Sequence, residues 1–216
     1  MLQFLIKLNP LTRKDLSPSK INGIHEFIWA LTGLMLTVFG TFVEVFLVIP
    51  SGTKIEDLNP TSLGITYQLL GVFFTGCVGG KNAGAYAQIA YVILGLFRLP
   101  VFYQGGTFEY LQQPTFGYIL GFIPGAWLCG FLSLPGKRRL ELFVISAFVG
   151  LLAIHFCGIV YLFFYTLIAP FLGIELAENY FFDAISLYSM SPFFAQIAII
   201  CVMAILAFLV RLILFY

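Results

Sequence analysis

Long apolar segments, joined by short connectors, constrain this chain more than any other feature. Of its 216 residues, 60% are hydrophobic and only 10% are charged, whereas soluble domains carry about 25% charged residues. A helix that crosses a bilayer needs about 20 mostly apolar residues. We therefore predict an all-α integral membrane protein, one domain over residues 1–216, with six transmembrane helices. The predicted spans are 24–49, 63–78, 83–99, 116–134, 142–172 and 193–215, with a hinge at 79–82 between the second and third.

Lysine and arginine positions predict the orientation of these spans, because such residues concentrate in cytoplasmic loops. Basic residues precede the first span, occur at Lys81 in the hinge, and form the run 137–139 between the fourth and fifth spans. The alternate connectors contain acidic residues and at most one basic residue each. This alternation predicts cytoplasmic N and C termini. It also places the connector 98–113, which is rich in glycine, aromatic and amide residues, on the outer face.

The sequence excludes several classes of function. The net charge is +1, and no basic stripe interleaved with aromatic residues indicates a nucleic-acid partner. There is no P-loop, no His-Glu-x-x-His and no Gly-x-Ser-x-Gly, and the four cysteines are scattered singly through apolar segments. We predict no catalytic residue, no metal site and no enzyme activity. Any uphill transport would need an energising partner.

A stripe of polar and small residues runs along the third predicted span. Its members recur at intervals of four, three, four and three, which is one face of a helix: Gly84, Gln88, Tyr91, Gly95 and Arg98. Arg98, at the outer end, has the geometry to pair with a carboxylate. Two interpretations stay open at this point. The stripe either lines a ligand site, or packs helix against helix with Arg98 reaching the lipid headgroups.

Other polar groups lie at comparable depth in neighbouring spans. Gln68 and Tyr118 are expected near the outer ends of the second and fourth spans, where a concave pocket lined by aromatic and amide groups would suit a small ligand. Glu44, in the outer half of the first span, is either a site or gating residue or a protonated structural one. His155 stands alone in the fifth span, which favours a hydrogen bond to a neighbouring helix over catalysis.

A second small-residue face lies on the first span. Gly33, Thr37 and Thr41 recur at intervals of four, a spacing that permits close approach of another helix. That helix belongs either to a neighbouring span or to a separate membrane subunit.

Two motifs carry a resemblance to a known family. The first is Gly84-Ala-Tyr-Ala-Gln-Ile-Ala-Tyr-Val-Ile-Leu-Gly-Leu-Phe-Arg-Leu-Pro-Val-Phe102, and the second is Pro114-Thr-Phe-Gly-Tyr-Ile-Leu-Gly-Phe122. Together they resemble the BioY family, the biotin-specific substrate-binding (S) components of energy-coupling factor (ECF) transporters. In the second motif Phe116 replaces a glycine of the family pattern.

The resemblance implies a multi-pass protein of the cytoplasmic (inner) membrane that binds biotin near the outer face without a covalently bound cofactor. It also implies delivery to the cytoplasm with an ECF transmembrane coupling subunit and an ATPase pair, for which Gly33, Thr37 and Thr41 would be the docking face. Arg98 would pair with the biotin carboxylate, and amides and tyrosines would bond its ureido ring. The predicted ligand-binding set is Gln68, Gln88, Tyr91, Arg98, Tyr118, Asn82, Tyr86 and Gln196.

The last predicted span departs from the family pattern. The family carries Pro-Gly-Asp-Leu-x-Lys there, whose Asp and Lys contact biotin, whereas this chain reads Ser191-Pro-Phe-Phe-Ala-Gln-Ile-Ala-Ile199. Gln196 stands at or near the position of the acid, and an apolar residue replaces the lysine. This departure keeps two alternatives open: a non-transporting structural or assembly protein on the same scaffold, and a stand-alone facilitator for a related small carboxylic vitamin.

Overall fold

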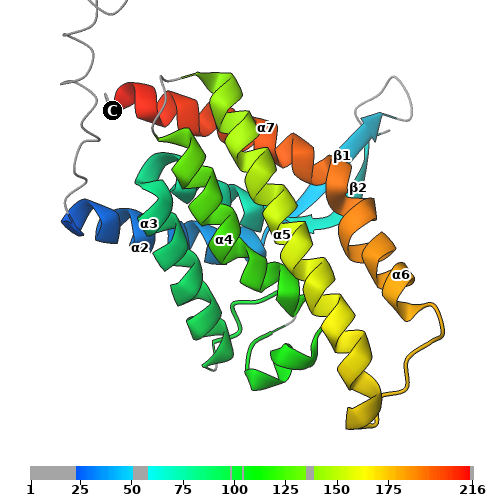
Figure 1. Cartoon of the computed structure of the whole chain (residues 1–216). Coiled ribbons are helices and arrows are strands. Elements are labelled where there is room, and N and C mark those ends of the chain that lie inside the picture. The colour runs from blue at the N-terminus through cyan, green and yellow to red at the C-terminus, as the bar shows by residue number, and fades with distance from the viewer. Residues whose placement is uncertain (1–22, 51–57, 98, 104, 135–138, 215–216) are drawn as a thin grey trace, which may run out of the picture.

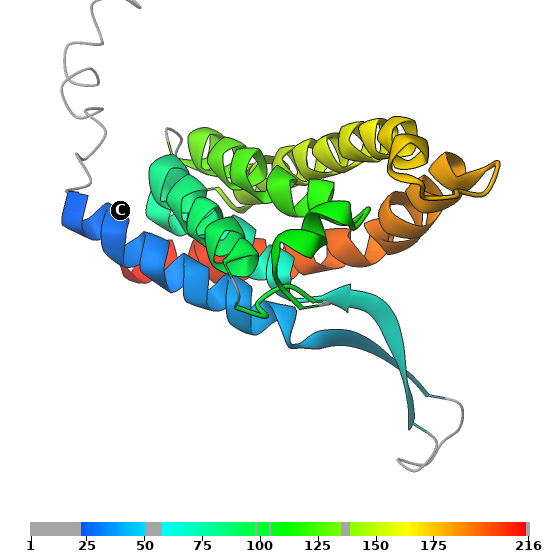
Figure 2. The ribbon, with the colours of Figure 1, turned by 90° about the horizontal axis from the view of Figure 1, so that it is seen from below.

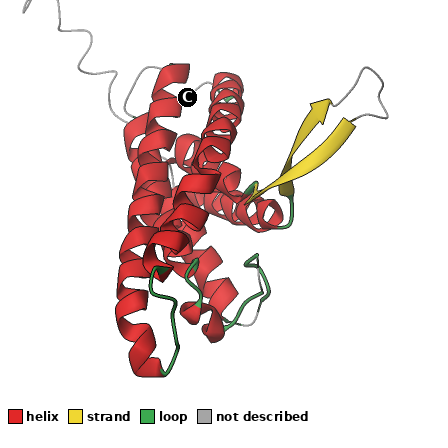
Figure 3. Cartoon of the chain, turned by 90° about the vertical axis from the view of Figure 1, so that its right-hand side faces the viewer, coloured by secondary structure: helices red, strands yellow, loops and turns green. Residues whose placement is uncertain are grey.

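The computed structural model describes residues 23–50, 58–97, 99–103, 105–134 and 139–214. These residues form a bundle of helices from which one β-hairpin projects (Figures 1 and 3). The helical elements are α2 (Gly23–Thr41), α3 (Gln68–Leu96), η2 (Phe108–Gln112), α4 (Phe116–Ser133), α5 (Leu140–Ile168), η3 (Ala169–Leu172), α6 (Tyr180–Ile185), η4 (Ser186–Met190) and α7 (Ser191–Ile213). The strands are β1 (Glu44–Pro50) and β2 (Leu58–Thr66).

Apolar side chains cover the outside of the bundle as well as its core. Phe156 on α5 is 69% exposed and Phe194 on α7 is 81% exposed. Soluble monomers rarely expose large contiguous apolar patches, so a hydrocarbon surrounding explains this surface. Four helical stretches of the described chain are long and apolar enough to cross a membrane: Gly23–Thr41, Phe116–Ser133, Leu140–Leu172 and Tyr180–Ile213. The chain is therefore a multi-pass membrane protein.

The first predicted span, 24–49, is wrong after Thr41. Helix α2 ends at Thr41, and the chain continues as strand β1, which pairs antiparallel with β2. The residues predicted as helix that form a strand instead read Glu-Val-Phe-Leu-Val-Ile-Pro. Their β-branched and aromatic side chains favour a strand. An apolar run alone does not separate a strand from a buried helix. The hairpin extends away from the helices (Figure 2).

The second predicted span, 63–78, starts too early for the same reason. Residues up to Thr66 belong to β2, and α3 begins at Gln68. The hairpin register pairs Phe46 with Ser62 and Glu44 with Thr66, with an irregularity between Glu44 and Phe46. As a result, the base of the hairpin lies directly beside the first turn of α3.

The predicted hinge at 79–82 is confirmed within α3. Gly80 has φ 93° and ψ 172°, a backbone conformation that only glycine adopts readily. The chain folds back there, because a Cβ added to Gly84 would lie 3.1 Å from the Cα of Gly76. The second and third predicted spans are thus the two antiparallel halves of α3, and the third ends at Leu96 rather than 99.

Glycines also form the contact between α4 and α5. A Cβ on Gly121 would lie 2.8 Å from the Cα of Ile154, and one on Gly125 would lie 3.0 Å from the backbone oxygen of Gly150. The small-residue ridge of α4 is therefore a packing seam. The fourth and fifth predicted spans, 116–134 and 142–172, agree with α4 and with α5 plus η3 to within two residues.

The last predicted span, 193–215, corresponds to α7, which starts at Ser191 with Pro192 in its first turn. That position suits proline, since its missing N–H would have no helical partner there. The preceding connector is not a loop throughout, because α6 and η4 lead directly into α7. In Figures 1 and 2 the C-terminal end of α7 and the first turn of α2 lie at the same end of the bundle.

Candidate ligand-binding site

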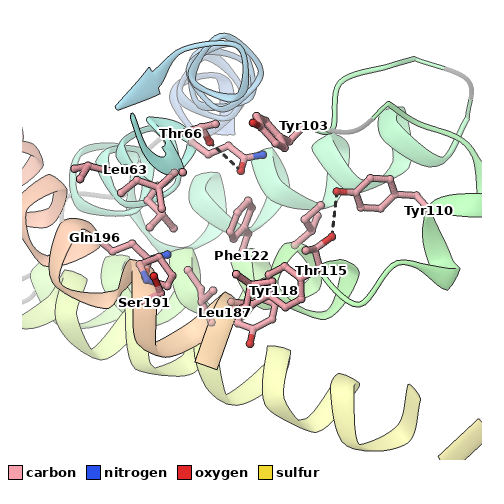
Figure 4. Close-up of a pocket in the computed structure, with 18 residues that line it drawn as sticks. Leu63, Thr66, Tyr103, Tyr110, Thr115, Tyr118, Phe122, Leu187, Ser191 and Gln196 are labelled. Atoms are coloured by element: carbon pink, nitrogen blue, oxygen red, sulfur yellow. Dashed lines mark hydrogen bonds between the residues drawn. The ribbon is translucent and has the colours of Figure 1, made fainter. Parts of the chain in front are cut away.

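A cavity of about 280 Å³ opens beside the last residues of β2, where the hairpin joins the bundle. The first turns of α3, α4 and α7 surround it, together with β2, the 99–115 connector, the middle of α5 and η4 (Figure 4). Its size suits a small ligand. It is lined by Leu63, Gly64, Ile65, Thr66, Gln68, Leu69, Tyr103, Tyr110, Thr115, Tyr118, Ile119, Phe122, Ile154, Leu187, Tyr188, Ser191, Pro192 and Gln196.

The lining is neutral as far as the structure describes it: amides, hydroxyls and rings, with no lysine, arginine, aspartate or glutamate. Such a site selects ligands by hydrogen bonding and shape rather than by ion pairing. Three of the predicted residues contribute to it, namely Gln68, Tyr118 and Gln196.

Gln68 is held by a buried tyrosine behind the cavity wall. Its Nε2 donates to the Tyr91 hydroxyl at 2.6 Å, and that hydroxyl donates to the Val101 carbonyl at 2.8 Å. The Tyr91 hydroxyl also lies 3.1 Å from Thr41 Oγ1. The Gln68 Oε1 accepts only a long bond of 3.5 Å from the Thr66 hydroxyl. Tyr91 therefore orients the Gln68 amide and leaves its oxygen available as an acceptor.

The opposite side of the cavity contains four linked polar groups. The Tyr118 hydroxyl lies 2.6 Å from Ser189 Oγ, which lies 3.1 Å from His155 Nδ1. His155 Nε2 lies 2.8 Å from Gln196 Oε1. The prediction that His155 bonds a neighbouring helix is confirmed, since Gln196 belongs to α7. The tyrosine and the glutamine line the cavity, and the serine and histidine are buried behind them.

The hairpin and the 99–115 connector meet at Glu44, next to Tyr103, which lines the cavity. Its carboxylate accepts from Tyr103 at 2.9 Å and from Ser62 at 3.1 Å. The sequence predicted Glu44 within a transmembrane helix. That prediction is wrong, because Glu44 is the first residue of strand β1. The hydrogen bond to this carboxylate raises the pKa of Tyr103 above its ordinary value, because the neutral phenol is the donor.

A cluster of aromatic rings closes the side of the cavity next to the connector. The rings of Phe102 and Tyr110 lie 4.7 Å apart, and that of Phe116 lies 6.3 Å from Tyr110. Phe116 is 2% exposed, so the residue that departs from the family glycine packs inside the protein. Tyr161 on α5 adds a hydrogen bond to the Leu111 carbonyl, which fastens η2 to the bundle.

The polar stripe of the third span is a buried packing face. Gly84, Gln88, Tyr91 and Gly95 are all buried, which confirms that they share one face. Gln88 Nε2 donates to Thr37 Oγ1 at 3.1 Å, and Gly95 contacts the Phe102 ring. Within the described residues, neither Gln88 nor Tyr91 lines the cavity. Arg98, the last member of the stripe, lies outside the described residues.

Two further candidates lie away from the cavity. Asn82, next to the hinge, donates to Glu26 Oε1 at 3.0 Å and so links α3 to α2. Tyr86 is 57% exposed on the outer surface of α3. Helical periodicity gave no means of separating these side chains from those that reach the cavity.

The small-residue face of α2 packs against α3. Thr37 and Thr41 are no more than 1% exposed, and a Cβ on Gly33 would overlap the Thr75 side chain. Of the two interpretations of this face, the structure shows contact with a neighbouring helix of the same chain. All three residues are buried within this chain.

Sequence reasoning missed several lining residues. Thr66 is the last residue of β2, a strand that was not predicted. Tyr110 lies in η2 and Thr115 lies between η2 and α4, a segment whose fold no periodic pattern indicated. Tyr188 belongs to η4, and Ser191 is the first residue of α7. From the sequence alone, the aromatic residues of the connector 173–191 are consistent with either an interfacial aromatic belt or a lid over a site. Tyr188 in fact lines the cavity. The aromatic and hydroxyl content of both connectors was the available signal.

The membrane-spanning bundle and its neutral cavity define a multi-pass membrane protein with a candidate site for a small molecule. The model of the BioY family matches residues 13–214, almost the entire chain. The chain belongs to the BioY family.

The chain is also similar to individual relatives and, in fold, to a solved structure. The chain is 29% identical over 186 residues to a 21.2 kDa protein of the psbX-ycf33 intergenic region of Cyanophora paradoxa, covering 85% of this chain and 93% of that one. It is 34% identical over 132 residues to a probable biotin transporter BioY of Lysinibacillus sphaericus, covering 59% of each chain. The crystal structure of the S-component for biotin from an ECF-type ABC transporter matches in fold with a TM-score of 0.60 and 16% identity, over 89% of this chain and 94% of that one.

Proposed function

We propose that this protein is the substrate-capture component of a vitamin transporter and that it binds biotin in the cavity between α3, α4 and α7. It is a transporter component rather than an enzyme. The observation that carries the proposal is the neutral, amide-lined cavity of about 280 Å³ in a chain of the BioY family. A relative of that family is described as a probable biotin transporter, which supports the same ligand.

The cavity groups match the chemistry of a cyclic urea. A ureido ring offers two N–H donors and one carbonyl acceptor. The Gln68 oxygen is available as an acceptor for a ureido N–H, and the hydroxyls and the Gln196 amide on the facing wall supply further polar partners. Leu69, Phe122 and Ile154 provide the apolar surface that the rest of the bicyclic ring requires.

The carboxylate of biotin needs a cationic or strongly donating partner. The sequence points to Arg98, which follows α3 in the chain and has a guanidinium suited to bidentate pairing. Asn82, Tyr86, Gln88 and Tyr91 are not proposed as direct ligands. Tyr91 would act through Gln68, which it holds in place.

For transport, we propose six membrane crossings, with the two halves of α3 counted separately, and both termini on the cytoplasmic side of the cytoplasmic membrane. This topology is supported by the first turn of α2 and the C-terminal end of α7, which lie at the same end of the bundle (Figures 1 and 2). The alternation of basic residues between connectors supports it as well. The cavity then faces outward. Because the sequence has no nucleotide-binding motif, inward delivery would depend on an ECF coupling subunit and an ATPase pair.

Calorimetric titration of the purified protein with biotin, and with other small carboxylic vitamins, tests the proposed ligand. Saturable binding of biotin is expected. Gln68→Met keeps the length of the side chain and removes its amide, and should weaken binding by about tenfold, the effect of roughly 1.4 kcal/mol. Asn82→Leu, a polar-to-apolar change far from the cavity, is the matched control for binding. If biotin gives no heat and no thermal stabilisation, the proposed ligand is wrong.

A separate experiment tests energised delivery. Cells that require external biotin would be supplied with this chain alone, or with an ECF coupling subunit and ATPases. Growth at trace biotin only with the full set supports capture for an energised transporter. Equal growth with the chain alone would instead show facilitated diffusion, and binding without uptake in either case would contradict a transport role.

A further inference from the structure

The four linked polar groups beside the cavity have hydrogen-bonding roles that constrain one another. We propose that Tyr118, Ser189, His155 and Gln196 form a hydrogen-bond relay of fixed direction, which presents the Gln196 amide nitrogen to the cavity as a donor for a ligand oxygen. His155 is the positioning residue of this relay. The assignment of that oxygen to the ureido carbonyl of biotin rests on the proposed function.

The direction follows from the atom next to His155. A glutamine Oε1 is only an acceptor, so His155 Nε2 must carry a hydrogen to make the 2.8 Å bond. In a neutral imidazole Nδ1 is then the acceptor, and Ser189 must donate to it across 3.1 Å. The serine hydrogen is thereby used, so Tyr118 donates to Ser189 across 2.6 Å.

This direction leaves every hydrogen within the relay with an acceptor. The groups left over are the two N–H bonds of Gln196 at the cavity, and no hydrogen bond among the described residues occupies them. The reverse direction would turn the amide and place its oxygen at the cavity, and one of the two hydroxyl hydrogens, that of Ser189 or that of Tyr118, would have no acceptor among the described residues. The first direction satisfies every hydrogen within the relay and is therefore favoured.

Aromatic packing holds the imidazole in the required orientation. The His155 ring lies edge-on to Tyr118, with centroids 5.8 Å apart, and 5.5 Å from the ring of Phe193. His155 itself is only 6% exposed. A ring confined in this way cannot turn to exchange its two nitrogens without displacing both neighbours, so the donor at Gln196 is set before a ligand arrives.

The consequence for specificity concerns the ligand atom near Gln196. A donor there selects a carbonyl or other acceptor and disfavours a group that can only donate. 2-Iminobiotin, whose protonated cyclic guanidinium has an N–H donor in place of the ureido carbonyl oxygen, therefore should bind less well than biotin. With Gln68 offering an acceptor on the other side, the cavity would present one acceptor and one donor, as a cyclic urea requires.

Nitrogen-15 NMR of histidine-labelled protein tests the relay without any ligand. The chain has two histidines, His25 and His155, and a His25→Gln variant identifies the signals of the second. The expected result is the Nε2–H tautomer of His155 with a hydrogen-bonded, unprotonated Nδ1. Observation of the Nδ1–H tautomer would overturn the proposed direction.

Binding measurements test the consequence. Gln196→Glu keeps an acceptor for His155 and replaces the cavity donor by a carboxylate oxygen. Biotin binding should fall by at least about tenfold, the effect of one hydrogen bond to a ligand, and the preference should shift towards 2-iminobiotin. Unchanged biotin affinity and preference in this variant would contradict the inference.

Two substitutions at His155 separate positioning from packing. His155→Phe keeps an aromatic ring but removes both nitrogens, and should weaken biotin binding by about tenfold. His155→Gln supplies one amide donor and one acceptor and should recover most of that loss. Wild-type affinity in His155→Phe would overturn the positioning role. If the wild-type protein binds no biotin, the proposed function fails, and the tautomer of His155 still decides the relay.

Discussion

Replacing Tyr91 by phenylalanine tests how the buried face of α3 supports the cavity. Tyr91 is completely buried, and its hydroxyl accepts from Gln68 at 2.6 Å and donates to the Val101 carbonyl at 2.8 Å. Phenylalanine keeps the ring and its edge contact with Phe102, whose centroid lies 5.3 Å away. The substitution therefore removes hydrogen bonds while the apolar packing stays the same.

The expected effect has two parts. Removing one partner of a buried hydrogen bond leaves the other without a partner, at a cost of about 1–3 kcal/mol. The Val101 carbonyl and the Gln68 amide are both affected, so the free energy of unfolding should fall by at least about 1–3 kcal/mol. Gln68 also loses the anchor that orients its oxygen towards the cavity. Biotin affinity should therefore fall by about tenfold, which corresponds to roughly 1.4 kcal/mol.

Denaturant unfolding in detergent and calorimetric titration with biotin measure the two parts. The matched control is Tyr86→Phe on the same helix, because Tyr86 is 57% exposed and does not line the cavity. The control should change neither stability nor affinity. If Tyr91→Phe behaves like Tyr86→Phe in both assays, Tyr91 does not orient Gln68, and the hydrogen-bond geometry has been misinterpreted.

Two further predictions concern the hinge and the base of the hairpin. Gly80→Ala should lower the thermal unfolding temperature through a destabilisation of about 1–3 kcal/mol, because φ 93° with ψ 172° strains any residue with a Cβ. The control is Gly23→Ala, where a Cβ meets open space, and it should leave that temperature unchanged. Glu44→Gln should return the pKa of Tyr103 towards its ordinary value, as followed by carbon-13 NMR of labelled tyrosine, since the carboxylate that favours the neutral phenol is removed. The pKa of Tyr103 is raised in the folded state, so the stabilising contribution of the wild-type pair is present below the ordinary tyrosine pKa and is lost as the pH rises through the raised pKa. An unchanged titration of Tyr103 in Glu44→Gln would show that the pair does not form.

Composition was sufficient for the membrane class and for most helix positions. The segments that became α4, α5 and α7 are long, apolar and bounded by glycine, proline or charge, so their ends agree closely with the prediction. The hinge was predictable too, since two consecutive glycines interrupt an apolar run. The hairpin was not, because Val45–Ile49 satisfies a hydropathy criterion for a helix as readily as for a strand. Length and β-branched content were the only clues to the correct state.

The candidate site was predictable in part for a related reason. Periodicity correctly placed Gln88 and Tyr91 on one helix face, but it does not reveal what lies opposite that face. In this fold α2 and the first half of α3 lie there, so these side chains bond Thr37 and Gln68 instead of a ligand. The cavity formed where helix ends meet two connectors, and the positions of connector residues such as Tyr110 and Tyr188 depend on tertiary packing.

The sequence of the last helix acquires a physical explanation from the residues around it. The family that this chain resembles places an acid and a lysine there, whereas this chain has Gln196 and an apolar residue. A buried charge needs a partner or it destabilises the protein strongly, and the described lining of the cavity contains no charged side chain to serve as one. A neutral amide avoids that cost, but a freely rotating amide would offer a ligand either its oxygen or its nitrogen. The 2.8 Å bond from His155 removes this ambiguity by holding the Gln196 oxygen. His155 and Gln196 therefore act as one unit, in which an oriented neutral donor stands where the family pattern has an acid and a lysine. Substituting either residue alone should weaken recognition of the same ligand atom.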